Sequence, residues 1–149
     1  MAGETVVRPV RSGDRETWEP LWQGYLTFYQ ATLGPDVTDA TWRRFVDPLE
    51  GLGALVAERD GQLIGLAHYL LHRSTWAPVC YCYLEDLFVD PSVRGSGAGR
   101  ALIAAVEAAA RDAGASRLYW MTHETNQTAQ KLYNQVAERP GFVQYRKKF

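Results

Sequence analysis

The sequence predicts a mixed α/β fold (α+β), in which a mostly antiparallel sheet is flanked by about four helices. The main evidence is one stretch that changes from strand to turn to helix. Residues 79–89 are rich in aromatic and β-branched side chains and end at Asp90-Pro91, where proline stops a strand. From Ala98 onward, apolar side chains recur at the four-residue spacing of a helix.

A hairpin before this stretch indicates antiparallel pairing. Residues 53–59 and 62–72 are two strand-like apolar runs. Asp60-Gly61 between them is a strong hairpin signal, because this type of turn requires positive φ.

The elements before the hairpin follow from their local patterns. Residues 5–10 predict a first strand. The three- and four-residue spacing of aromatic and leucine side chains predicts a helix over about residues 15–31, which Gly34-Pro35-Asp36 ends. A second helix is predicted over residues 39–47, with Thr38 as its cap.

The remaining elements alternate between strand and helix. Gly114 is expected to stop the long helix, and residues 117–122 predict a strand. A further helix runs from Asn126 to about Glu138, and residues 142–148 predict a final strand. The predicted order is therefore β-α-α-β-β-β-α-β-α-β.

Length and composition indicate a single globular domain, residues 1–149, with 46% apolar and 22% charged side chains. The net charge of −1 gives no electrostatic footprint for nucleic acid or an anionic membrane, so we expect neither as a partner. Cys80 and Cys82 are spaced poorly for a disulfide, and no apolar run approaches the length of a membrane span. We therefore expect buried thiols in a cytoplasmic protein.

Three glycines in five residues, Gly95, Gly97 and Gly99, separate the predicted strand from its helix. Glycines let the backbone approach a ligand closely, and the N–H groups that open a helix are free donors. This pattern predicts a site for a phosphate-bearing ligand. It is not a P-loop, because Arg100 stands where lysine is required, and the glycine spacing differs from the dinucleotide fingerprint.

The spacing Arg94-x-x-Gly97-x-Gly99 resembles the pyrophosphate-binding signature of the Gcn5-related N-acetyltransferases (GNAT), and the order of elements is similar across nearly the whole chain. Asn126-x-x-Ala129-x-x-x-Tyr133 resembles the helix of that family which holds the pantetheine arm. The resemblance implies the acyl-CoA N-acyltransferase fold, with acetyl-CoA as donor and coenzyme A as product. The implied cofactor-binding residues are Leu87, Phe88, Val89, Arg94, Gly95, Ser96, Gly97, Ala98, Gly99, Arg100, Asn126 and Tyr133.

Two further stretches resemble branches of this family. Tyr83-Leu84-Glu85-Asp86 is similar to a strand of the diamine (spermidine/spermine) acetyltransferases. The segment Trp120-Met121-Thr122-His123-Glu124-Thr125-Asn126 is similar to one in the yeast-type histone and other protein acetyltransferases. From the first likeness we hypothesise that Glu85 is the general base and that Asp86 contacts the ammonium of the acceptor. The alternative for Asp86 is a structural carboxylate that bonds loop amides.

Acetyl transfer to an amine requires an acid and a base. An aliphatic ammonium has a pKa of about 10, so a base must remove its proton before the nitrogen attacks. Strand alternation sends Glu85 and Asp86 to opposite faces unless a bulge, which the resemblance places near Asp86-Leu87, intervenes. Tyr133 fits the general acid for the thiolate, because a phenol is a donor at neutral pH; the alternative is a core tyrosine.

Other side chains are candidates for the acceptor pocket. An aromatic face attracts an amine by cation–π contact, which makes Tyr25 and Tyr29 candidates, with core packing as the alternative. His123 follows a predicted strand on the acceptor side; the alternative is a plain loop histidine. His68 and His72 have no third ligand in view, so we expect no metal site.

We therefore expect an acetyl-CoA-dependent N-acetyltransferase that acetylates a primary amine by direct attack in a ternary complex. The acceptor is a small amine, a polyamine, an amino acid or a lysine side chain. The alternative is a non-catalytic acetyl-CoA-binding or protein-interaction module with the same fold. The resemblance also implies a homodimer.

Overall fold

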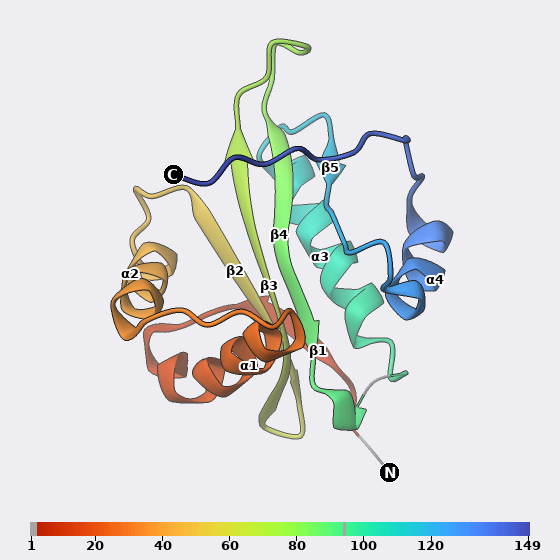
Figure 1. Cartoon of the computed structure of the whole chain (residues 1–149). Coiled ribbons are helices and arrows are strands. Elements are labelled where there is room, and N and C mark those ends of the chain that lie inside the picture. The colour runs from red at the N-terminus through yellow and green to blue at the C-terminus, as the bar shows by residue number, and fades with distance from the viewer. Residues whose placement is uncertain (1–2, 94) are drawn as a thin grey trace.

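The computed structural model describes residues 3–93 and 95–149 (Figure 1). The elements are β1 (Val6–Pro9), the 3₁₀ turn η1 (Ser12–Asp14), α1 (Arg15–Phe28), α2 (Pro35–Val46), β2 (Leu52–Arg59), β3 (Gln62–His72), β4 (Tyr81–Val89), the 3₁₀ turn η2 (Pro91–Val93), α3 (Ala98–Asp112), β5 (Leu118–Tyr119) and α4 (Gln127–Val136). The strands follow the order β1-β2-β3-β4-β5, with antiparallel neighbours except for the parallel pair β4–β5. The predicted fold class is confirmed.

Two apolar clusters hold the helices on opposite faces of the sheet (Figure 1). On one face, Leu102 and Val106 of α3 pack with Leu84 of β4, and α4 adjoins this cluster. On the other face, Trp18 of α1 and the side chains of α2 pack with Phe88 of β4. Strand β4 therefore contributes to both clusters. In the part of the chain that the structure describes, no helix is long and apolar enough to cross a membrane.

A β-bulge in β4 shifts the alternation of its side chains. His68 pairs with Asp86, whereas the residue after His68 pairs with Leu84, so Glu85 is an extra residue opposite β3. Leu84 accordingly faces α3, while Phe88, four residues later, faces α1. Regular alternation would place these two side chains on the same face. The bulge lies one residue earlier than the resemblance implied.

Strand β5 is shorter than predicted. It pairs with β4 only at Cys82–Leu118 and Tyr83–Tyr119, and it ends there instead of extending to residue 122. The ladder between the two strands therefore stops at Tyr83, well before the carboxyl end of β4.

The predicted limits of the first two helices were wrong. The second helix begins at Pro35, not near residue 39, with Gly34 as its N-cap. Proline is well placed in a first helical turn because the N–H that it lacks has no partner there. Thr38 is consequently a buried helical residue, and its hydroxyl accepts a hydrogen bond from the Trp22 indole at 3.3 Å. The first helix ends at Phe28, not at residue 31.

The predicted final strand, residues 142–148, is not formed. The C-terminal segment, residues 138–149, runs across the strands in Figure 1 without joining the sheet. Phe142, Val143 and Tyr145 are 83%, 77% and 93% exposed. A strand needs the backbone of a second strand as its partner, and this chain brings none to these residues. The strand-like apolar pattern of this segment therefore stays outside the sheet, and its side chains are exposed.

Candidate active site

A cleft of about 440 Å³ lies between β4, the glycine-rich turn and α4. It is lined by Phe28, Tyr29, Leu87, Phe88, Val89, Gly95, Ser96, Gly97, Ala98, Gly99, Arg100, Asn126, Thr128, Ala129, Leu132 and Tyr133. Every residue predicted to bind the cofactor is in this lining except Arg94, which lies outside the described residues. Segments that are far apart in the sequence therefore meet at one cavity.

The glycine-rich turn presents backbone and hydroxyl groups at one end of the cleft. Gly95 and Gly97 have φ values of +81° and +84°, which residues with a side chain rarely adopt. Gly97 is the N-cap of α3, so the first N–H groups of that helix open next to the turn. The hydroxyl oxygen of Ser96 is buried and has no hydrogen-bond partner among the described residues. This set of free donors fits a pyrophosphate.

Asn126 joins the chain after β5 to the start of α4. Its Oδ1 accepts a hydrogen bond from the Ala129 N–H at 3.4 Å, and its Nδ2 donates to the Thr122 hydroxyl at 3.2 Å. Asparagine is favoured at this N-cap position because its oxygen satisfies an otherwise free helical N–H. Both bonds keep Asn126 at the wall of the cleft.

Tyr133 lies in the same wall, on α4. Its ring packs edge-on against Trp120, with centroids 5.4 Å apart. Burial, and to a lesser degree the neighbouring Tyr29, raises the pKa of Tyr133 to about 12. The hydroxyl is therefore protonated at neutral pH and can donate a proton.

The two carboxylates of β4 lie just before the segment that lines the cleft. Burial, followed by the charge of Asp86, raises the pKa of Glu85 above its ordinary value. The charges of both carboxylates, after burial itself, raise the pKa of Tyr25. Asp86 lies on the α1 side of the sheet, because its Oδ2 is 2.9 Å from Nδ1 of His68, whose ring packs against Trp18 of α1. Among the described residues, neither carboxylate has a lysine or arginine within ion-pair distance.

The predicted acceptor residues differ in their surroundings. Tyr29 lines the cleft, and its ring packs against that of Tyr25, with the ring centroids 5.0 Å apart. His123 is exposed and does not line the cleft, and its Nδ1 lies 2.7 Å from the Thr125 hydroxyl. Its role at the acceptor site stays a prediction.

Four lining residues were not predicted as site residues: Phe28, Thr128, Ala129 and Leu132. Ala129 belongs to the Asn126–Tyr133 motif, and Leu132 to the apolar face of the same helix, so both carried a usable signal. Nothing in the sequence distinguishes Thr128.

Comparison with known proteins identifies the family. The profile of the acetyltransferase (GNAT) family matches residues 16–137. The chain belongs to this family. It is 38% identical over 144 residues to a D-amino-acid N-acetyltransferase of Saccharomyces cerevisiae, a match that covers 95% of the chain and 89% of that relative. It is 32% identical over 125 residues to an aminoglycoside N(6')-acetyltransferase type 1 of Stenotrophomonas maltophilia, covering 79% and 75% of the two chains.

Solved structures show the same GNAT fold. The aminoglycoside acetyltransferase AAC(6')-Iy, in complex with a bisubstrate analog containing CoA, superposes with a TM-score of 0.85 at 23% identity. The match covers 98% of this chain and 99% of that one. The chain is thus an N-acetyltransferase that uses acetyl-CoA, and the reading as a non-catalytic binding module is not favoured.

A substitution at the turn tests its part in acetyl-CoA binding. Gly97→Ala should raise the KM for acetyl-CoA several-fold and lower the free energy of unfolding by about 1–2 kcal/mol, because alanine resists positive φ. Steady-state kinetics and denaturant titration measure the two effects. Gly13→Ala is the matched control, since a Cβ there also meets open space but Gly13 has no positive φ. Equal effects of the two substitutions would contradict the assignment.

Proposed function

We propose that this GNAT enzyme acetylates the primary amine of a small molecule, which Glu85 and Asp86 receive as an ammonium ion. The observation that carries the proposal is the pair of adjacent carboxylates, which have no lysine or arginine partner among the described residues and lie close to Tyr25. Such a site favours a cation. The net charge of −1 and the aromatic first helix favour a small amine over a polycationic protein. Relatives named for D-amino acids and aminoglycosides also act on amines.

Each predicted residue has one task in this scheme. Acetyl-CoA, when bound, supplies a thioester carbonyl; the backbone of Leu87 and Val89 holds the pantetheine arm, and the N–H groups from Gly95 to Arg100 hold the pyrophosphate. Asp86 holds the acceptor's ammonium beside Tyr25. Glu85 removes the proton, directly or through water, and the free amine attacks in the ternary complex. As the bond between the acetyl carbon and sulfur breaks, Tyr133 would donate its proton to the sulfur, and the second proton of the nitrogen would leave to solvent, from which Tyr133 is reprotonated.

The first test is turnover with defined amines. The purified protein is incubated with acetyl-CoA and separate panels of polyamines, amino acids, aminoglycosides and histone peptides, and free thiol is followed. We expect thiol release with one class of small amine. Acetyl-CoA binding without thiol release on every panel, even at high pH where free amine is plentiful, would contradict the proposal.

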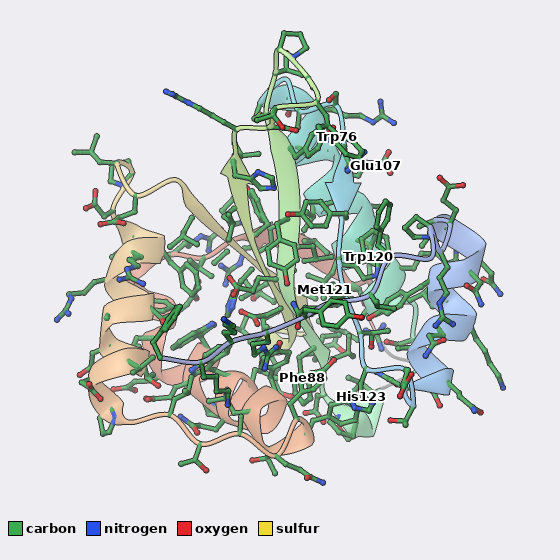
Figure 2. The ribbon with its side chains drawn as sticks, turned by 45° about the horizontal axis from the view of Figure 1, so that its top comes forward. Trp76, Phe88, Glu107, Trp120, Met121 and His123 are labelled. Carbon is green, nitrogen blue, oxygen red and sulfur yellow. The ribbon has the colours of Figure 1, made fainter. Side chains whose placement is uncertain are left out.

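We also propose that the enzyme is a homodimer in which the C-terminal segment is covered by the second copy. Support comes from the exposed side chains of Phe142, Val143 and Tyr145 on an extended segment outside the sheet. One described contact of this segment with the body of the protein is a hydrogen bond, which the side-chain amide of Gln144 donates to the sulfur of Met121. Met121 is labelled in Figure 2. Apolar side chains gathered on an exposed segment are typical of an interface.

Sedimentation velocity tests the homodimer. The protein should sediment with twice the mass of one chain, and Phe142→Asp should shift it towards the monomer, because a charge would then be buried in the interface. Leu49→Asp is the matched control, since Leu49 is 92% exposed and lies outside the segment. A monomeric wild-type protein would refute the dimer.

The remaining expectations complete the proposal. We propose a single N-acetyltransferase domain over residues 1–149, which the family match over residues 16–137 supports. We assign it to the cytoplasm because Cys80 and Cys82 are free thiols, although Cys80 is only partly buried where burial was predicted. The near-neutral charge supports the absence of nucleic-acid and membrane partners.

A further inference from the structure

A chain of buried polar groups links α1 to the acceptor side of β4. The indole Nε1 of Trp18 donates a hydrogen bond to Nε2 of His68 at 3.0 Å. Nδ1 of His68 lies 2.9 Å from Oδ2 of Asp86. Trp18 is fully buried and His68 is 2% exposed, so water does not compete for the contact between them. The proposed catalytic scheme uses neither Trp18 nor His68.

The indole determines where His68 carries its proton. An indole N–H can only donate, so Nε2 of His68 must accept and cannot carry a proton itself. The single proton of the ring is then on Nδ1, where it is donated to Asp86. A doubly protonated ring would set two N–H groups against each other at 3.0 Å in a buried site. His68 is therefore a neutral donor, and the negative charge of Asp86 is not cancelled by it.

The second neighbour of Asp86 is also a neutral donor. Burial, then the charge of Asp86 and a hydrogen bond to it, raise the pKa of Tyr25. The phenol therefore keeps its proton at neutral pH and adds no positive charge beside Asp86. Within residues 3–93 and 95–149, no lysine or arginine reaches this carboxylate. His68 orients the anion, Tyr25 beside it is neutral, and the charge of Asp86 remains available to a ligand.

The bulge makes the arrangement possible. Because Glu85 is the extra residue of β4, Asp86 comes into register directly opposite His68. The side chain of Asp86 is 13% exposed, so it is mostly sequestered without being closed off.

We infer that Trp18 and His68 are positioning residues that hold Asp86 as an oriented, uncompensated carboxylate for the ammonium group of the acceptor. The inference rests on the proposed function, which it deepens. Trp18 occupies Nε2 of His68 as a donor and so keeps it free of a proton, and Nδ1 of His68 fixes one oxygen of Asp86. The other oxygen is left to the incoming amine.

Kinetics of three variants test the inference. His68→Leu removes the donor and Asp86→Asn removes the charge, so each should raise the KM for the amine about tenfold and leave the KM for acetyl-CoA within about twofold. His68→Asn places an amide N–H near the position of Nδ1 and should restore most of the loss. Equal impairment by His68→Asn and His68→Leu, or a parallel rise of both KM values, would show a merely structural role.

A spectroscopic measurement tests the same network without turnover. In ¹H–¹⁵N spectra of the imidazole at neutral pH, His68 should show a proton on Nδ1 and a bare Nε2. A proton on Nε2 in the wild-type protein would overturn the inference. An unchanged KM for the amine in Asp86→Asn would also overturn the inference, but it would not contradict the proposed acetyl transfer. Absence of turnover with every amine would instead refute the proposed function. The position of the proton on His68 would still show whether Trp18, His68 and Asp86 form one hydrogen-bonded chain.

Discussion

Replacing Glu85 with glutamine should lower kcat at neutral pH by a hundredfold or more, because a general base typically contributes about 10²–10⁴ in rate. Glutamine keeps the size of the side chain and its position in the bulge but cannot take a proton. The KM for acetyl-CoA should stay nearly unchanged, since Glu85 lies outside the cleft lining.

The pH dependence identifies the base. A base acts only when it is deprotonated, so the wild-type rate should rise with pH through the pKa of Glu85. Burial and Asp86 raise that pKa, so this limb should lie above the ordinary glutamate range. The Glu85→Gln variant should lack the limb, whereas Glu107→Gln should keep it. Glu107 is the matched control because it is half exposed on α3, paired with Arg111, and distant from the cleft lining (Figure 2). An unchanged profile in Glu85→Gln would remove this residue from the mechanism.

Tyr133→Phe should lower kcat about ten- to a hundredfold with little change in thermal stability. Phenylalanine retains the edge-on contact with Trp120 and removes only the hydroxyl. Because the pKa of Tyr133 is raised to about 12, the wild-type phenol is protonated throughout the neutral range. Loss of the donor should therefore appear at every pH from 6 to 9, unlike the loss in Glu85→Gln.

The split between kcat and stability tests this assignment. Tyr69→Phe is the control, since Tyr69 is also partly buried against the core but lies outside the cleft lining. Full activity of Tyr133→Phe would show that this tyrosine serves packing alone.

Local patterns were sufficient to predict most of the fold. The Asp60-Gly61 turn, with its positive φ at both residues, and the change to helical spacing at Ala98 are both properties of neighbouring residues. The spacing of Asn126 and Tyr133 likewise places both on one cleft wall, because it is set by a single helix. Where a short segment decides the conformation, the sequence was informative.

Features that depend on distant partners could not be predicted. The bulge at Glu85 follows from the register between β3 and β4, and only the fold decides whether adjacent carboxylates share a face. Trp18 and His68 are 50 residues apart, and each reads alone as an ordinary core residue. The C-terminal segment shows the same limit, because its strand-like pattern has no partner strand within one chain.

The bulge has a consequence for how this enzyme can change. Glu85 has no opposite residue in β3, so its side chain makes no cross-strand pair on which the sheet depends. The proposed base therefore occupies a site where chemistry and folding stability are nearly independent. Side chains of other proton affinities can be exchanged at this position by mutation or by design, without compensating changes in the core.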